Sequence, residues 1–119
     1  MADATTTVAS LREAMRQFVA EREWEQFHSP KNLVMALAAE AAELLEHFLW
    51  VDNAESKRMV QEPEKRRAVA DEIADVAGCL LSLSNALNLD LSDAINDKMA
   101  RNKNKYPVEQ YRGRSTLER

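Results

Sequence analysis

Residues that interrupt helices are scarce in this chain. Only two of its 119 residues are glycine and three are proline, while alanine, leucine, glutamate, lysine and arginine are abundant. A β-sheet protein needs many turns that glycine and proline favour, and the abundant residues are strong helix formers. The sequence therefore predicts an all-α protein. Its length suits one domain with a single core and is too short for an enzyme with a cleft between two lobes.

Hydrophobic periodicity and the positions of proline divide the chain into four predicted helices. They cover residues 8–22, 30–50, 63–88 and 91–105. Thr7 or Ser10 is expected to cap the first helix and Asp90 the fourth, while Pro30 and Pro63 suit first helical turns. The predicted architecture is a four- to five-helix bundle.

Two segments lie outside these helices. Residues 51–62 are polar and lack a clear apolar stripe, so we interpret them as a linker with room for one helical turn. Pro107 is expected to stop the last helix, and residues 108–119 show no periodicity. The sequence thus predicts a single domain over residues 1–110 and a flexible tail over residues 111–119.

Cysteine usage and hydropathy favour a cytoplasmic protein. Cys79 is the only cysteine, which excludes an internal disulfide and suits a reducing compartment. No N-terminal apolar run resembles a signal peptide, and no uninterrupted apolar stretch approaches the roughly 18–20 residues that span a bilayer. We therefore expect no membrane partner.

Charge is unevenly distributed along the chain. The formal net charge is −4, which argues against a nucleic-acid polymer as partner. Residues 1–97 hold 9 basic and 18 acidic side chains, whereas residues 98–119 hold 7 basic and 2 acidic ones. An acidic body with a basic end could hold metal ions at one end of a ligand and phosphates at the other. The alternative is a solvated, disordered C-terminus.

Four carboxylates occupy matched positions on two of the predicted helices. With about 100° of rotation per residue, Glu40 and Glu43 lie at the rim of the apolar face of the second helix. Glu72 and Asp75 lie at the rim of the stripe of the third. That stripe consists of Val69, Ile73, Val76, Leu80, Leu83 and Leu87. Four converging carboxylates would repel one another strongly unless a cation lay among them.

Oxygen-only ligands favour Mg²⁺ or Mn²⁺ over zinc. The plainer alternative is that each carboxylate is a rim residue paired with a surface lysine or arginine. A di-iron carboxylate bundle is a further rival, but it needs Glu-x-x-His pairs. Glu43 and His47 are one residue too far apart for such a pair, and the third predicted helix contains no histidine.

With these residues in view, the chain resembles the MazG-like, all-α nucleoside triphosphate pyrophosphohydrolases. Their signature is E-x-x-E followed by E-x-x-D, here Glu40 to Glu43 and Glu72 to Asp75. The match extends to the run EREWEQFHSPKNL over residues 21–33, to Phe48-Leu49-Trp50, and to Lys98, Met99, Asn102 and Lys105-Tyr106-Pro107. These segments are similar to the dCTP pyrophosphatase branch of the family, and the resemblance covers approximately residues 8–110.

The resemblance implies Mg²⁺-dependent hydrolysis of a deoxynucleoside triphosphate, expected to be dCTP or modified dCTP, to the monophosphate and pyrophosphate. Such a reaction cleanses the nucleotide pool. The implied catalytic residues and metal ligands are Glu40, Glu43, Glu72 and Asp75. The implied nucleotide-binding residues are Trp24, His28 and Trp50 for base and sugar, Asn102 for the nucleotide, and Lys98, Arg101 and Lys105 for the phosphates.

Two positions depart from this branch. Members with a cytosine preference tend to carry a tyrosine four residues after the last acidic ligand and a histidine in the first helix, where this chain has Cys79 and Met15. Cys79 is expected to be a small buried hydrophobe at the border of the base pocket, and we count it among the substrate-binding residues. A broader or dUTP-directed pyrophosphatase and a non-catalytic, oligomeric nucleotide-binding module are therefore the alternatives.

Several implied roles have structural alternatives. Basic residues near a helix C-terminus also complement the helix dipole, which applies to Lys98, Arg101 and Lys105. A tryptophan such as Trp50 that ends a helix is more often a core or interface anchor. His28 would more often anchor a loop than take part in catalysis.

Two further expectations concern catalysis and assembly. Glu40 is the predicted general base, because it lies deepest against apolar neighbours and its pKa is the most readily raised.

The apolar surface of Met15, Phe18 and the third helix exceeds what one thin layer of helices needs. We therefore expect helix-on-helix packing into a homo-oligomer, a dimer of dimers, with a pocket shared between subunits.

Overall fold

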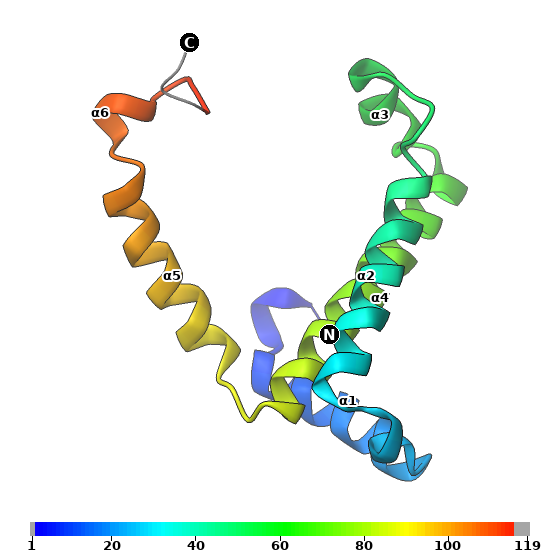
Figure 1. Ribbon diagram of the computed structural model, residues 1–119. Coiled ribbons are helices and arrows are strands. Elements are labelled where there is room, and N and C mark those ends of the chain that lie inside the picture. The colour runs from blue at the N-terminus through cyan, green and yellow to red at the C-terminus, as the bar shows by residue number, and fades with distance from the viewer. Residues whose placement is uncertain (1, 116–119) are drawn as a thin grey trace. The chain divides into compact units, whose positions relative to one another are not determined.

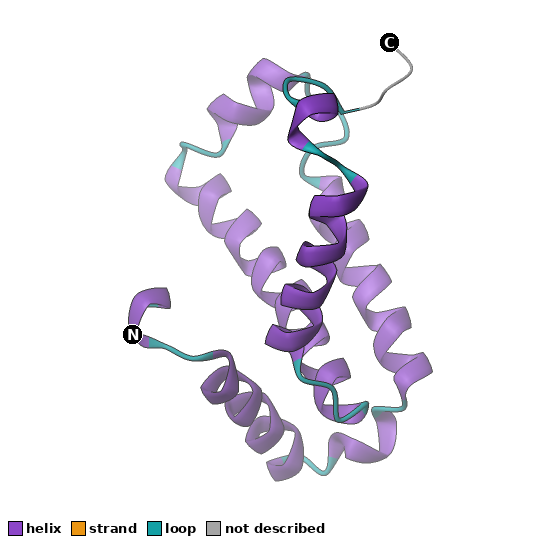
Figure 2. Cartoon of the chain, turned by 90° about the vertical axis from the view of Figure 1, so that its left-hand side faces the viewer, coloured by secondary structure: helices purple, strands orange, loops and turns teal. Residues whose placement is uncertain are grey.

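The structure is a computed structural model that describes residues 2–115. Within this range it contains helices and connecting loops and no β-strand (Figure 2), which confirms the all-α class. None of the described helices is both long and apolar enough to cross a membrane. The elements in chain order are the 3-10 helix η1 (Asp3–Thr5), α1 (Val8–Glu21), the 3-10 helix η2 (Trp24–Phe27), α2 (Pro30–Glu46), α3 (Asn53–Met59), α4 (Pro63–Ala86), α5 (Leu91–Lys105) and α6 (Val108–Tyr111).

Side-chain caps account for the start of four helices. The hydroxyl of Thr7 accepts a hydrogen bond from the Ser10 amide at 3.0 Å before α1, and Ser29 caps α2 in the same way. Asp52 and Asp90 cap α3 and α5 through carboxylates that accept from the amide three residues on. Each bond satisfies an amide that has no partner within the first helical turn. Thr7 is thus the first cap, and the Asp90 cap is confirmed.

The chain divides into two compact units, Met1–Asn88 and Leu89–Arg119. In the first unit α2 packs against α4, and α1 packs against both α4 and η2 (Figure 1). The second unit holds α5 and α6. Asn88 has a φ of 50°, a left-handed conformation that asparagine tolerates and that suits the end of α4. The single domain over residues 1–110 stays a prediction.

One predicted helix end was wrong, and two segments contain more helix than expected. The second helix ends at Glu46 instead of Trp50, and turns cover residues 47–50. The predicted linker contains α3, a helix of seven residues, and a four-residue helix, α6, begins at Val108 where no element was expected. Helices this short carry too few residues to show a hydrophobic period. Residues 116–119 of the predicted tail lie outside the described range, and its flexibility stays a prediction.

The apolar stripe of α4 is only partly covered by this chain. Val69 is buried, and Val76 and Leu83 are half-buried. The members that stay between 40% and 53% exposed are Ile73, Leu80 and Leu87. Among the described residues no large side chain falls below 2% exposure. The stripe therefore presents apolar surface beyond what α1 and α2 bury.

Candidate active site

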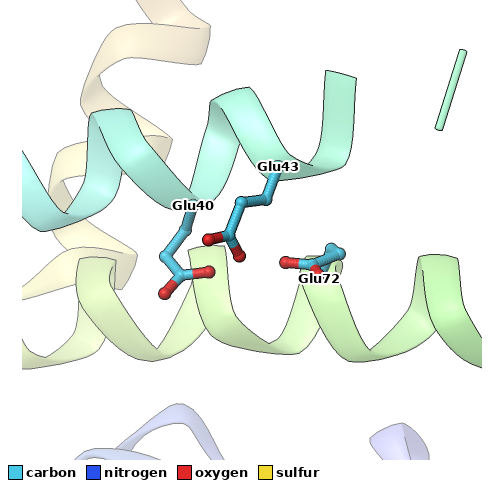
Figure 3. A group of neighbouring side chains, drawn as sticks. All are labelled: Glu40, Glu43 and Glu72. Carbon is cyan, nitrogen blue, oxygen red and sulfur yellow. The ribbon is translucent and has the colours of Figure 1, made fainter. Parts of the chain in front are cut away.

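Three carboxylates converge between α2 and α4. Glu40 and Glu43 extend from α2 towards Glu72 on α4 (Figure 3). One oxygen atom of each lies within 4.8 Å of the others. Residues three apart on a helix share one side, so the α2 pair faces the same stretch of α4. The structure thus brings together three of the four carboxylates that the sequence singled out.

Two of these carboxylates have a buried oxygen without a partner. Within residues 2–115 no group hydrogen-bonds to Oε2 of Glu40 or of Glu72, although both atoms are shielded from solvent. Burial raises the pKa of Glu40. A hydrogen bond with Glu43 and repulsion from the charges of Glu43, Asp75 and Glu72 raise this pKa further. Burial also raises the pKa of Glu72, as do Glu43 and Asp75, whereas a positive charge on His47 would oppose that shift. The charged form of either group is therefore costly here without a cation.

The donor set fits a divalent cation. Carboxylate oxygens that repel one another and lack protein partners are the ligands that Mg²⁺ and Mn²⁺ prefer. None of the ion pairs in the described part of the chain involves the cluster; these pairs are Arg16–Glu13, Arg22–Glu21, Arg58–Glu55 and Arg101–Asp97. This pattern argues against rim residues neutralised by surface cations. The acidic cluster is able to hold a divalent metal ion.

A cavity of about 360 Å³ adjoins the carboxylates. Glu40 and Asp75 both line it, so the fourth predicted carboxylate faces the same space although it is not among the three that converge. Met15 and Cys79 line the cavity as well, and burial raises the pKa of the Cys79 thiol, with Glu40 and Asp75 raising it further. The volume is within the range of small-molecule sites. The cavity is therefore lined by carboxylates at one part of its wall and by largely uncharged side chains elsewhere.

Trp24 and His28 also line this cavity. Glu23, with a φ of 53°, turns the chain after α1 in a left-handed conformation that is uncommon for glutamate. Trp24 then packs edge-on against Phe18, with ring centroids 5.7 Å apart and an angle of 75°. Trp50, by contrast, is 93% exposed and is not among the residues that line the cavity. Within this described chain, Trp24 and His28 reach the cavity and Trp50 does not.

The remaining predicted residues lie on α5, in the second unit. Arg101 donates a hydrogen bond to Asp97 at 3.0 Å, and the Lys105 ammonium lies 5.3 Å from the centroid of the Tyr106 ring. Lys98 is exposed and Asn102 is half-buried. A contact of these residues with the substrate stays a prediction.

The sequence analysis missed a pair beside the cluster. Nζ of Lys65, on α4, lies 2.9 Å from Nδ1 of His47, which follows α2. Both side chains are half-buried. A signal was present, because His47 lies four residues after Glu43 and Lys65 lies seven residues before Glu72, so each shares a helix side with a carboxylate.

A second cavity, of about 510 Å³, was also missed. It shares Met15, Val19, His28 and Ser82 with the first cavity. At its wall the side-chain oxygen of Asn85 accepts hydrogen bonds from Arg12 at 2.9 Å and from Arg16 at 3.1 Å. These partners are about 70 residues apart in sequence, and helical periodicity carries no information about such distant pairing.

Sequence comparison adds an independent finding. Residues 35–116 match the sequence profile of the MazG-like family. The chain belongs to the MazG-like family. It is similar to dCTP pyrophosphatase 1 of Rattus norvegicus, with 40% identity over 107 residues, and of Homo sapiens, with 38% identity over 102 residues. These matches cover 90% and 86% of this MazG-like chain but only 63% and 60% of the relatives, so it spans less than two thirds of their length.

A solved structure agrees in fold. The MazG-like chain superposes on a pyrophosphatase from Archaeoglobus fulgidus DSM 4304 with a TM-score of 0.80 and 32% sequence identity. The match covers 90% of this chain and 98% of that one. The arrangement of the helices is therefore shared with a protein described as a pyrophosphatase.

Proposed function

We propose that this chain is a Mg²⁺-dependent nucleoside triphosphate pyrophosphohydrolase that converts dCTP and modified dCTP to dCMP-type products and pyrophosphate. The observation that carries this proposal is the convergence of Glu40, Glu43 and Glu72, with two buried, unpartnered oxygens, beside a cavity of nucleobase-compatible size. Membership of the MazG-like family and similarity to dCTP pyrophosphatases support it. Removal of such nucleotides would serve nucleotide-pool house-cleaning.

The reaction is a hydrolysis at the α-phosphorus. The oxygen of a water molecule forms a bond to that phosphorus, and the bond from the phosphorus to the oxygen that bridges to the β-phosphorus breaks. The bond's electron pair stays on the bridging oxygen, which leaves with pyrophosphate. The proton of the water must pass to a base, for which Glu40 is proposed because it belongs to the cluster and one of its oxygens is buried without a hydrogen-bond partner.

The proposed metal ligands are Glu40, Glu43, Glu72 and Asp75. When bound, Mg²⁺ supplies positive charge against the phosphate oxygens and lowers the pKa of a water molecule. Glu43 and Glu72 orient the site from opposite helices, α2 and α4. Asp75, which faces the adjoining cavity, completes the set on the substrate side.

The 360 Å³ cavity is proposed to hold the base and sugar. Trp24 offers an aromatic face for stacking, which contributes about 1–3 kcal/mol per base in single-strand binders. His28 offers ring nitrogens for hydrogen bonding. Met15 and Cys79 supply an adaptable apolar wall, which favours tolerance of substituents on the base. Trp50 is proposed to contact the substrate only within an assembly, since it is exposed in this chain.

The basic face of α5 is proposed to contact the nucleotide. Lys98, Arg101 and Lys105 recur at helical spacing, and Asn102 lies on the same helix. Replacing Lys98 by methionine is expected to raise KM for the triphosphate with little change in the affinity for the nucleoside. An unchanged KM would remove Lys98 from the proposed phosphate contacts.

Assembly and location complete the proposal. The exposed members of the α4 stripe and Trp50 support a homo-oligomer, proposed to be a dimer of dimers. Light scattering on the purified chain tests this, and a monomer at micromolar concentration would contradict it. A cytoplasmic location is proposed from the single, unpaired Cys79.

The deciding experiment is a panel of triphosphates assayed for pyrophosphate release with Mg²⁺ and with EDTA. The panel comprises dCTP, 5-methyl-dCTP, dUTP, dTTP, dATP, dGTP and CTP. Metal-dependent release that favours the cytosine nucleotides supports the proposal. An even profile would favour the broader or dUTP-directed alternative, and no release from any nucleotide would favour the non-catalytic binding module.

A further inference from the structure

On both α2 and α4, the residues that line the cavity and the carboxylates of the cluster lie along one side of the helix. On α2 this side carries Leu33 and Ala36, which line the cavity, and then Glu40, Glu43 and, just after the helix, His47. Successive positions are three or four residues apart, which keeps them on one side of a helix. His47 lies four residues beyond Glu43, a rise of about 6 Å. The cavity and His47 therefore lie on opposite sides of the carboxylates along α2.

The same order holds on α4 in the reverse chain direction. Cys79 and Asp75 line the cavity, Glu72 belongs to the cluster, and Lys65 lies seven residues before Glu72, two turns along the same side. The 2.9 Å contact of Lys65 with His47 joins the two helices at this end. The cavity, the carboxylates and Lys65 thus follow one another along the length of the packed pair α2 and α4.

The ammonium group of Lys65 has hydrogen-bond donors that its contact with His47 does not use. Within the described residues it makes no ion pair with a carboxylate, in spite of the acidic cluster two turns away. An ammonium group only donates hydrogen bonds, so the contact assigns Nδ1 of His47 as the acceptor and Nε2 as the ring nitrogen that carries the proton. Two of the three Lys65 donors and the Nε2–H of His47 stay available to acceptors.

We propose that Lys65, oriented by His47, binds the β- and γ-phosphates of the substrate, the two groups that leave as pyrophosphate. This inference rests on the proposed function. A nucleotide whose base occupies the 360 Å³ cavity and whose α-phosphate lies at the carboxylates directs its remaining phosphates towards this pair. When the bond between the α-phosphorus and the bridging oxygen breaks, the added negative charge falls on pyrophosphate, beside the Lys65 ammonium. Phosphate is a ligand that a lysine ammonium suits well.

A purely structural tie between α2 and α4 makes a different prediction. Lys65 also lies near the C-terminus of α2, where a cation is favourable for the helix dipole. If that were its whole role, its loss would lower stability and weaken all ligands alike. If Lys65 binds phosphate, its loss should weaken the binding of pyrophosphate more than that of the monophosphate product, because only pyrophosphate extends to Lys65.

The test is calorimetric titration of inorganic pyrophosphate with Mg²⁺, and separately of dCMP with Mg²⁺, into full-length variants. Lys65→Met keeps the aliphatic stem and removes the charge, and Lys65→Arg keeps the charge. Lys57→Met is the matched control, an exposed lysine on the neighbouring helix α3. We expect Lys65→Met to weaken pyrophosphate binding by about tenfold or more and dCMP binding by less than about twofold. Lys65→Arg should recover most of the pyrophosphate affinity, and Lys57→Met should match the unmodified protein.

Three results would overturn this inference: unchanged pyrophosphate affinity in Lys65→Met, equal losses for pyrophosphate and dCMP, or an equal loss in Lys57→Met. Melting temperatures of the variants identify any that fail to fold, and His47→Gln, which retains an acceptor, then serves as a milder second variant expected to weaken pyrophosphate but not dCMP. Pyrophosphate release by the unmodified protein is scored first. No release from any triphosphate refutes the proposed function itself, whereas release together with unchanged pyrophosphate binding in Lys65→Met refutes only the role of Lys65.

Discussion

Acidic residues at helical spacing occur in two very different settings in this molecule. On α1 and α3 the three-residue spacing joins a glutamate to an arginine, as in Glu13–Arg16 and Glu55–Arg58, and these pairs lie at the surface. Between α2 and α4 the same spacing joins Glu40 to Glu43, and Glu72 opposes them from the other helix. The first setting neutralises charge locally. The second accumulates negative charge that no basic residue in residues 2–115 pairs with.

The difference shows what distinguishes a functional carboxylate from a surface one. Exposed ion pairs contribute between 0 and about 1 kcal/mol, because solvent screens them. The cluster carboxylates repel one another, and Glu40 and Glu72 are half-buried while Glu43 is exposed. Such repulsion destabilises the metal-free fold, and natural chains retain such arrangements where a ligand offsets the cost. The four predictions below test this contrast, beginning with the largest expected effect.

Replacing Glu72 by glutamine should separate activity from stability. The variant loses a proposed metal ligand, so pyrophosphate release should fall by about 100-fold or more. Without metal, however, its melting temperature should rise, because one of the repelling charges is gone. Glu46→Gln, an exposed position at the end of the neighbouring helix α2, is the matched control and should change neither quantity. Retained activity, or a lower melting temperature in EDTA, would contradict the account.

The free energy of unfolding should depend on pH differently with and without metal. The pKa values of Glu40 and Glu72 are raised by burial and by neighbouring carboxylates, so the metal-free folded state binds more protons than the unfolded state. In EDTA the free energy of unfolding should therefore fall as the pH rises above the ordinary value of 4.5 through the raised folded-state values. Mg²⁺ should flatten or invert this slope, because it binds the deprotonated form. Urea denaturation at several pH values measures the free energy of unfolding. If that free energy depended on pH in the same way with and without Mg²⁺, the carboxylates would hold no metal.

The Asp52 cap offers an acidic residue with a local partner. Its carboxylate accepts a hydrogen bond from the Glu55 amide at 2.8 Å at the start of α3. Asp52→Ala should lower the free energy of unfolding by about 1 kcal/mol, and Asp52→Asn by only a few tenths, since asparagine caps nearly as well. Urea denaturation measures both. A gain in stability from Asp52→Ala would mean that this carboxylate behaves like those of the cluster.

The Glu55–Arg58 pair should show the smallest effect. Arg58 is 78% exposed in its side chain, so Arg58→Ala should change the free energy of unfolding by no more than about 0.5 kcal/mol. The change should shrink further at about 1 M salt, where charges beyond roughly 3 Å are screened. A loss above about 2 kcal/mol in urea denaturation would show that the surface pairs contribute more than the contrast allows.

Local sequence information predicted the long helices of both units. The starts of α2 and α4 follow from Pro30 and Pro63, and the starts of α1 and α5 from the caps Thr7 and Asp90. Helix α3 was missed because seven residues show no period. Helix α2 ends four residues before Trp50, where the amides of His47 and Phe48 bond to carbonyls three residues earlier, a change that apolar periodicity does not reveal. Local rules thus predict where long helices start better than where they end.

The candidate site was predictable to the extent that it lies along helix faces. The spacing of Glu40, Glu43 and Glu72 was sufficient to expect their convergence, since α2 and α4 are consecutive long helices, separated only by the short α3, and pack together. The contact between His47 and Lys65 was not predicted, because it depends on how far α2 and α4 slide past each other. The Arg16–Asn85 hydrogen bond depends on how α1 crosses α4. Relative position of helices is a tertiary property that a single helix sequence does not specify.

The most direct test of the central claim is to locate the metal. Crystals grown with Mn²⁺ and measured near the manganese absorption edge would give an anomalous signal at each bound ion. The account predicts a peak between α2 and α4, within coordination distance of oxygens from Glu40, Glu43 and Glu72, which is absent in Glu72→Gln. Crystals of the unmodified protein with no peak at this position, or with Mn²⁺ bound only elsewhere, would contradict the account.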